Sequence, residues 1–129
     1  MSPAEQKLQL AEKHLHRVQL AWSEPDWADL AIYGFYCLEA AVEAAAIAVS
    51  LPMKKAHWDK ANASAELHRQ HSLPDVEGLM RDLNDARKAE AYGDVVPPSL
   101  DPEDVATEIE QYVRAVGNLL QQLDGEEGN

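Results

Sequence analysis

Cysteine is almost absent from this chain, because Cys37 is the only one among its 129 residues. A single thiol excludes an internal disulfide framework and a cysteine-rich zinc finger. The apolar neighbours of Cys37 predict a buried structural thiol rather than a nucleophile. A chain without disulfides suits a reducing compartment, and residues 1–17 are too polar for the hydrophobic part of a signal peptide. We therefore expect a cytoplasmic protein.

Glycine is also scarce, and the common catalytic and metal-binding motifs are missing. None of the six glycines stands in a G-x-G frame, which excludes a glycine-rich phosphate loop, and no G-x-S-x-G nucleophile elbow occurs. No glutamate has a histidine three residues later, as di-iron helical bundles require. His68 and His71 share a helix face, but the sequence offers them no evident carboxylate or thiolate partner. We expect neither a metal nor a cofactor.

Positive charge is in short supply, since 11 Lys and Arg residues stand against 23 Asp and Glu residues, a formal net charge of −12. This balance opposes binding of nucleic acid over the whole surface. The cations are concentrated in residues 54–88, where they roughly balance the acids, while the rest of the chain is strongly acidic. An anion is therefore expected to bind in this middle region. The alternative is that each cation is solvated or paired within its own helix.

The longest apolar run, LAIYGFYCLEAAVEAAAIAVSL at residues 30–51, is long enough to span a bilayer. It carries Glu39 and Glu43 near its middle, where charges in lipid are costly. We interpret the run as the buried central helix of a soluble bundle and expect no membrane association. The two glutamates lie on one helix face, so they either point outward between neighbouring helices or meet a cation such as an arginine.

Helical periodicity and helix-capping residues occur along the whole chain, and no segment predicts a strand. The SPAE sequence at residues 2–5 is a capping box, and Asp101 followed by Pro102 begins the last helix in a similar way. We predict one all-α domain over residues 1–123, followed by a disordered acidic tail over 124–129. The domain is expected to be an antiparallel bundle of four long helices and one short helix. The long helices are expected at about 3–22, 26–51, 74–92 and 101–123. The short helix is expected from about Asp59, after a loop that holds Lys54, Lys55 and His57.

The fourth predicted helix places an arginine on its apolar stripe. Val76, Met80 and Leu83 step by four and three residues, and the next step falls on Arg87. One interpretation is that Arg87 extends its side chain toward solvent or caps the negative end of the helix. The other is that its guanidinium lies at a cleft or a subunit interface, where it can grip a phosphate or carboxylate. Lys88 and Tyr92 follow on the neighbouring face.

Two segments together resemble the HEPN domain family, named for nucleotide-binding proteins of higher eukaryotes and prokaryotes. They are the aromatic and alanine-rich AIYGFYCLEAAVEAA and, further along, DLNDARKAEAYGD at residues 82–94. The order and length of the elements over residues 5–122 are also similar. The resemblance implies an all-helical bundle that dimerises. It also implies that Arg87 matches the family's motif arginine, and that Lys54, Lys55 and His57 occupy the loop in which family members carry a lysine and a histidine.

Ribonuclease members of that family carry a histidine four to six residues after the motif arginine, and two such motifs meet across a dimer. Here Tyr92 stands at the histidine position, and no histidine lies four to six residues after any arginine. A tyrosine, with a reference pKa of about 10, is a poor general base at neutral pH. The resemblance therefore implies a member without ribonuclease activity.

We expect a non-catalytic HEPN-like module that binds a nucleotide, RNA or a partner protein, in a defence or toxin–antitoxin setting. Its partners would be a second copy of the chain and a nucleotidyltransferase or another protein. Two alternatives stay open: a divergent, metal-independent ribonuclease that uses Arg87 with Tyr92 at a dimer interface, and a purely structural interaction module. The expected ligand-binding residues are Lys54, Lys55, His57, Arg87, Lys88, Tyr92 and Asp94.

Overall fold

The computed structural model describes residues 1–23, 27–53, 57–92 and 100–127. Within these ranges the chain is all-helical and has no strand, which confirms the predicted all-α class. The helices are α1 (Pro3–Ser23), α2 (Trp27–Ala48), α3 (His57–His71), α4 (Glu77–Tyr92) and α5 (Pro102–Glu127).

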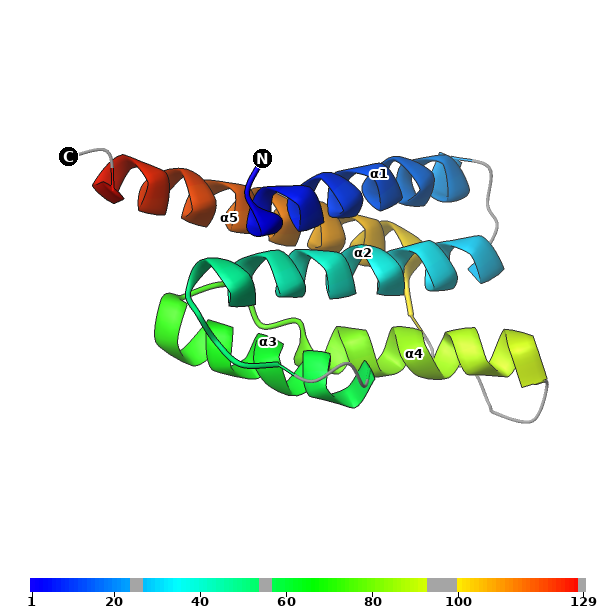
Figure 1. Cartoon of the computed structure of the whole chain (residues 1–129). Coiled ribbons are helices and arrows are strands. Elements are labelled where there is room, and N and C mark those ends of the chain that lie inside the picture. Colours follow the sequence, from blue (N-terminus) through cyan, green and yellow to red (C-terminus); the bar gives the residue numbers. More distant parts are fainter. Residues whose placement is uncertain (24–26, 54–56, 93–99, 128–129) are drawn as a thin grey trace.

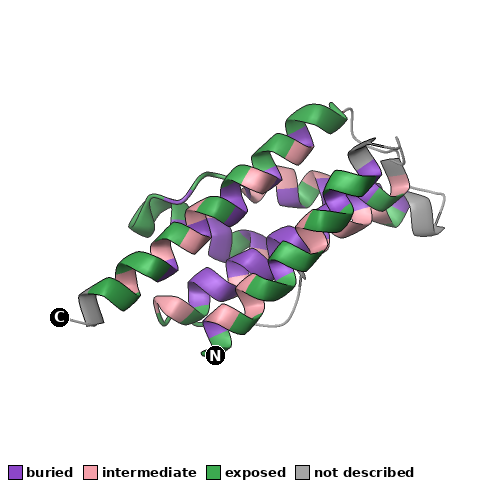
Figure 2. Cartoon of the chain, turned by 90° about the horizontal axis from the view of Figure 1, so that it is seen from above, coloured by how far each residue is buried: buried purple, intermediate pink, exposed green. Residues whose placement is uncertain are grey.

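Helix α2 is the central element of the bundle (Figure 1). It packs against each of the other four helices, while α1 also contacts α5, and α3 contacts α4. Figure 1 shows α1 and α5 on one side of α2, with α3 and α4 on the other. Viewed from above, α1 and α5 expose one face and bury the opposite one, as amphipathic helices on the outside of a core do (Figure 2).

The capping residues act as the sequence predicts at both ends of the chain. The Ser2 hydroxyl accepts a hydrogen bond of 3.1 Å from the backbone N–H of Glu5. The Asp101 carboxylate accepts bonds of 2.9 and 3.2 Å from the N–H groups of Glu103 and Asp104. These bonds satisfy donors that have no partner inside a helix, and so they determine where α1 and α5 begin.

Four predicted boundaries require correction. Helix α4 begins at Glu77 rather than at residue 74, and the Asp75 carboxylate accepts from the Glu77 N–H at 3.3 Å. Helix α3 has 15 residues and α4 has 16, so the third helix is not distinctly short, and it begins at His57 rather than Asp59. The second helix ends at Ala48, before the predicted end at Leu51, because Ser50 adopts a φ of 59° and the N–H of Leu51 turns back to the Ala46 carbonyl at 2.8 Å. Helix α5 continues to Glu127, so the predicted disordered tail begins as helix: residue 125 is a lone glycine, which weakens a helix without ending it.

The core is formed mainly by α2 and the inner faces of its neighbours. Phe35, Leu38 and Val42 of α2 are fully buried, as are Met80 and Leu83 of α4. The inner face of α5 is also buried, and its members are Val105, Ile109, Tyr112, Val113, Val116 and Leu120.

Cys37 is buried in this core, as predicted, and its thiol donates to the Ala11 carbonyl at 3.2 Å. Burial raises the pKa of the thiol to about 12. The thiolate that a nucleophile needs is therefore strongly disfavoured near neutral pH.

The length and composition of α2 also meet the requirements of a membrane span. Its candidate segment, Ala28–Ala48, has a mean hydropathy of 1.5, but 72% of the window is buried inside the bundle. Such burial is what a core helix surrounded by other helices shows, in agreement with the interpretation made from the sequence.

Candidate functional site on α4

A pocket of about 290 Å³ lies beside α4, where this helix meets α2 and α3. Its floor is apolar and includes the buried side chains of Phe35, Ala61 and Met80. Among the described residues, its polar rim comes from α4. Arg81, Asn84, Asp85 and Lys88 follow one another there at spacings of three, one and three residues. We call this cavity the α4 pocket. It combines an apolar floor with two cations, one amide and one carboxylate.

Arg81 is held in position at this rim by a neighbouring helix. Its Nη2 donates to Oδ1 of Asn62 on α3 at 2.8 Å, and its Nε lies 3.9 Å from Oε1 of Glu77. Lys88, one of the predicted ligand-binding residues, is exposed on the same rim. The two positive charges therefore lie at the opening of the pocket rather than under it.

Arg87 lies next to the α4 pocket without lining it. Its Nη2 donates to Oδ1 of Asn84 at 2.8 Å, and its guanidinium carbon lies 5.4 Å from the centre of the Phe35 ring. Its Nε is buried and has no hydrogen-bond partner among the described residues. Arg87 thus contacts two residues that line the pocket: its hydrogen bond holds the Asn84 amide, and its guanidinium lies over the Phe35 ring.

Glu39 and Glu43 meet a lysine instead of an arginine. The Nζ of Lys60 on α3 lies 3.4 Å from Oε2 of Glu39 and 3.0 Å from Oε1 of Glu43. The Nζ of Lys7 on α1 lies 2.8 Å from the other oxygen of Glu43. This charge cluster joins α1, α2 and α3. Of the two alternatives for this pair, the structure shows the one in which a cation meets the glutamates, and that cation is a lysine rather than an arginine.

Opposing effects act on the ionisation of this cluster. Burial by itself would raise the pKa of Glu43, but the hydrogen bonds and charges of Lys7 and Lys60 outweigh it and leave the pKa lowered. Burial would likewise lower the pKa of Lys60, and its two glutamate partners leave it raised. The charged form of both partners is therefore the favoured one.

A second polar cluster, between α1 and α2, did not emerge from the sequence. The His14 ring stacks on Tyr33 with centroids 6.2 Å apart, and Arg17 donates from Nη1 to the Tyr33 hydroxyl at 3.0 Å. Burial lowers the pKa of His14, and the charges of Arg17 and Lys13 lower it further. The sequence did carry a signal for this cluster. His14 and Arg17 are three residues apart, as are Tyr33 and Tyr36, and this spacing places each pair on one helix face.

The structure describes the predicted ligand-binding residues only in part. Arg87 and Lys88 are described fully: Lys88 lines the α4 pocket, and Arg87 lies beside it without lining it. His57 begins α3 and Tyr92 ends α4, but their side chains lie outside the described part of the chain. Lys54, Lys55 and Asp94 also lie outside the described residues.

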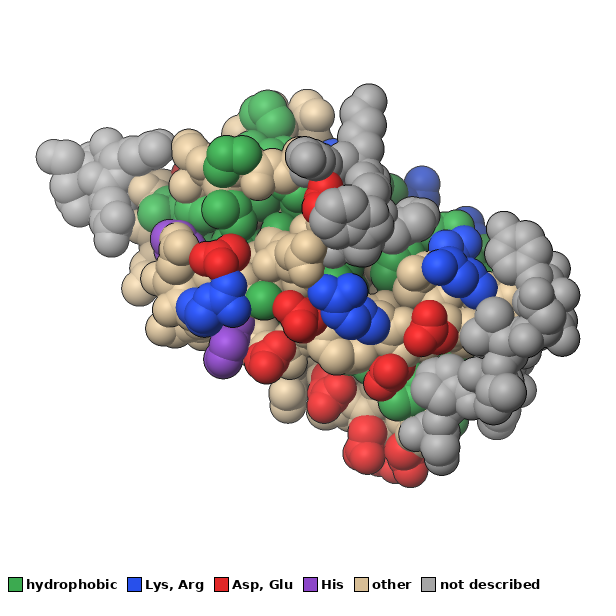
Figure 3. All heavy atoms as spheres, turned by 90° about the horizontal axis from the view of Figure 1, so that it is seen from below, with side chains coloured by type: hydrophobic (Ala, Val, Ile, Leu, Met, Phe, Trp, Pro, Cys, Tyr) green, Lys and Arg blue, Asp and Glu red, His purple; other side chains and the backbone are tan. Residues whose placement is uncertain are grey.

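The face formed by α3 and α4 has mixed charge rather than a continuous basic surface. Figure 3 shows its Lys and Arg side chains in separate groups, each beside acidic side chains. Among the described residues, no three His, Cys, Asp or Glu side chains gather in a way that could hold a metal ion. His68 instead donates through Nδ1 to the Leu73 carbonyl at 2.8 Å, which secures the chain after α3.

Comparison with known proteins leaves the chain unassigned, because no protein-family model and no curated protein matches it.

Proposed function

We propose that this protein is a HEPN-like, non-catalytic module that binds a small phosphate-bearing ligand, such as a nucleotide or an RNA end, in the α4 pocket. The observation that carries this proposal is the pairing of a buried apolar floor with Arg81 and Lys88 at the rim. Arginine suits phosphate because its planar fork donates two parallel hydrogen bonds, and lysine adds a point charge. Asn84 is oriented by Arg87 at the same rim.

The size of the ligand follows from the charges around the pocket. Asp85 lies between Arg81 and Lys88 in the sequence of α4, and all three residues line the pocket. The whole chain has a net charge of −12. A long RNA would bring many phosphates against this acidic surface, whereas a mononucleotide or a strand end brings few. A cavity of about 290 Å³ also suits a small ligand.

The family resemblance of residues 5–122 supports three further parts of this proposal. We propose a homodimer, a cytoplasmic location and a protein partner such as a nucleotidyltransferase in a toxin–antitoxin or other defence system. Lys54, Lys55 and His57, together with Tyr92 and Asp94, complete the binding region in this proposal.

A thermal-shift screen against AMP, ADP, ATP and a short RNA tests the binding. We expect one of these ligands to raise the melting temperature in a saturable way, because a ligand that binds only the folded state stabilises it. No shift with any of them would contradict the proposal and favour the structural interaction module.

Incubation with labelled RNA tests the ribonuclease alternative. We expect the RNA to remain intact, because no histidine stands at the motif position. Cleavage that disappears in Arg87→Ala, at unchanged melting temperature, would contradict the non-catalytic assignment.

A further inference from the structure

His14 of α1 lies against two tyrosines of α2, and the three rings form an aromatic cluster where these helices meet. The His14 ring stacks on Tyr33 with centroids 6.2 Å apart, and it is tilted against Tyr36 at 6.0 Å. Nδ1 of His14 is buried and has no hydrogen-bond partner in the described part of the chain. A proton on Nδ1 would be a buried donor without an acceptor, so the favoured form is neutral His14 with its proton on Nε2.

The charges that act on His14 also oppose its protonation. Burial, followed by the charges of Arg17 and Lys13, lowers the pKa of His14 from its usual 6.5. Helix α2 presents the phenols of Tyr33 and Tyr36, and tyrosine is uncharged near neutral pH. Helix α5 also contacts α1, but none of its described side chains adds a charge that changes this pKa. Protonation therefore places a third positive charge on this part of α1, whose residues 13–23 include no acid.

Arg17 is held against the same tyrosine as His14. Its Nη1 donates to the Tyr33 hydroxyl at 3.0 Å, and its guanidinium carbon lies 5.0 Å from the centre of the Tyr33 ring. A protonated His14 and Arg17 would thus be two like charges against one ring, three residues apart on one helix. Movement of α1 away from α2 relieves this repulsion and gives the Nδ1 proton access to water.

The only cysteine of the chain lies beneath the same part of α1. Sγ of Cys37 on α2 donates to the Ala11 carbonyl at 3.2 Å, and Ala11 lies three residues before His14. Cys37 is fully buried. Movement of α1 away from α2 at this point therefore exposes the thiol.

We propose that His14 makes the attachment of α1 to α2 sensitive to pH. Neutral His14 packs against Tyr33 and Tyr36, and protonated His14 releases this part of α1 and exposes Cys37. Because its pKa in the folded protein lies below 6.5, the stabilising contribution of His14 is complete above pH 6.5. It is lost as the pH falls through the lowered value.

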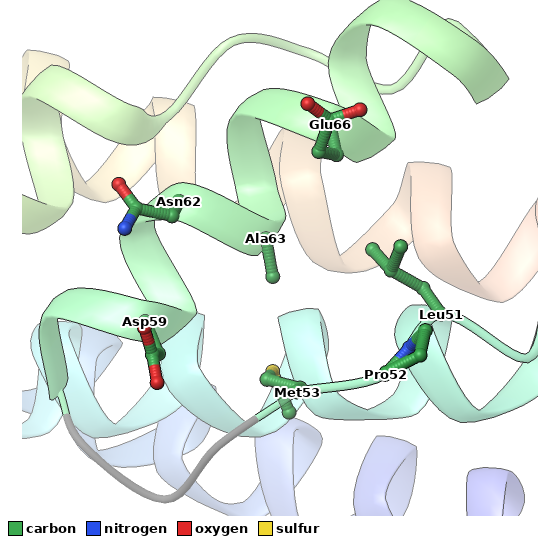
Figure 4. A pocket seen from close by; sticks show the side chains of 7 residues that line it. All are labelled: Leu51, Pro52, Met53, Asp59, Asn62, Ala63 and Glu66. Carbon is green, nitrogen blue, oxygen red and sulfur yellow. The ribbon is translucent and has the colours of Figure 1, made fainter.

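This inference does not depend on the proposed function, because α1 lines neither of the pockets on the other side of α2. One is the α4 pocket. The other, of about 370 Å³, is lined by α3 and by Leu51, Pro52 and Met53 (Figure 4).

The rate at which a dipyridyl disulfide labels Cys37 in the whole chain measures the opening of α1. The Cys37 thiolate attacks the reagent, forms a mixed disulfide and releases one pyridinethiol. Division by the labelling rate of the urea-unfolded chain at the same pH gives the open fraction. We expect this fraction to rise at least about twofold from pH 7.5 to 5.5, since each unit of lowered pKa is worth up to about tenfold. This range stays above 4.5, the usual pKa of Glu43.

His14→Phe keeps a ring against the tyrosines and removes the titrating group. We expect its open fraction to stay constant from pH 7.5 to 5.5. The matched control is His16→Phe, which makes the same chemical change at an exposed position two residues away and should keep the rise seen in the natural protein.

Two measurements on the natural protein keep the test independent of how the variants fold. NMR titration of the His14 ring should give a pKa below 6.5. Urea denaturation at each pH should give an unfolded fraction smaller than the open fraction, because α1 opens without the rest of the bundle. The proposal is overturned if the open fraction does not rise, if it rises equally in His14→Phe, if the pKa of His14 is 6.5 or higher, or if the open and unfolded fractions agree.

Discussion

Lys60 forms ion pairs with Glu39 and Glu43, two carboxylates that lie on one face of the central helix α2. Its ammonium lies within 3.4 Å of both Glu39 and Glu43, and all three side chains are largely buried. Like charges so close together repel each other strongly away from water, and the lysine removes that repulsion. Lys60 therefore adds an ionic link between α3 and α2 to their apolar packing.

Replacing Lys60 by methionine keeps the length of the side chain and removes its charge. We expect Lys60→Met to lower the free energy of unfolding by at least about 2 kcal/mol, because two buried carboxylates lose a common partner. Urea denaturation measures the change. The matched control is Lys7→Met, whose side chain is 42% exposed and should cost less than about 1 kcal/mol. Equal losses in the two variants would contradict the role assigned to Lys60.

The charge cluster also predicts how stability depends on pH. The pKa of Glu43 is held below its usual 4.5, so its stabilising contribution is present above that value and is lost as the pH falls through the lowered pKa. The pKa of Lys60 is raised above its usual 10.5, so its contribution is present below 10.5 and is lost as the pH rises through the raised value.

Urea denaturation of the natural protein and of Lys60→Met, from pH 7 down to pH 3, checks the acid side. We expect the difference in unfolding free energy between the two proteins to shrink as the pH falls below 4.5, because a protonated Glu43 no longer needs the lysine. A difference that stays constant over this range would mean that Lys60 acts through packing alone.

At the scale of single helices, α2 packs closely against α5 at Gly34. A Cβ added there would lie 2.9 Å from Cδ1 of Ile109, and Ile109 is itself fully buried. We expect Gly34→Val to lower the free energy of unfolding by about 1–3 kcal/mol, since the core has no room for the added methyl groups. Thermal or urea unfolding measures it.

Gly78 on α4 provides the contrasting position, because a Cβ there would meet nothing within 4 Å. Gly78→Ala should raise stability by up to about 1 kcal/mol through helix propensity alone. A Gly34→Val variant that is also as stable as the natural protein, or more stable, would contradict the close packing of α2 against α5 at Gly34.

Helix starts were easier to predict than helix lengths. Ser2 and Asp101 are local signals, because each caps a helix whose N–H groups lie within three residues. The start of α3 at His57 has no such cap in the sequence, and its length of 15 residues was underestimated. Packing against α2 and α4 supports this helix, and packing cannot be deduced from the helix's own residues.

The candidate site was predictable to a similar degree. The apolar stripe of α4 predicted that Arg87 would lie near other helices, and its guanidinium lies over Phe35 of α2 beside the α4 pocket. Lys88, predicted on the neighbouring face, is exposed at the rim of that pocket. Arg81, Asn84 and Phe35 were not among the predicted ligand-binding residues. Their role depends on where α2 and α3 meet α4, and a single sequence carries no record of those contacts.

At the scale of the whole molecule, the all-α class was predictable because every segment carries helical periodicity and α2 is apolar all round. The size of the assembly is a prediction from the family resemblance. We expect light scattering during size-exclusion chromatography, at tens of micromolar protein, to give twice the chain mass of 14.3 kDa. A clean monomer at that concentration would contradict the dimer.

Calorimetric titration of the α4 pocket tests the central claim most directly. The nucleotide that gives the largest thermal shift is titrated into the natural protein, into Arg81→Gln with Lys88→Gln, and into Arg114→Gln. Arg114 is the matched control because it lies on α5 and its side chain is 75% exposed.

We predict saturable binding that weakens as salt is raised, since cations at the rim hold the phosphate. The double variant should bind at least about tenfold more weakly, and Arg114→Gln should bind like the natural protein. Equal affinity in all three proteins, or no binding at low salt, would contradict a phosphate-binding site at the α4 pocket.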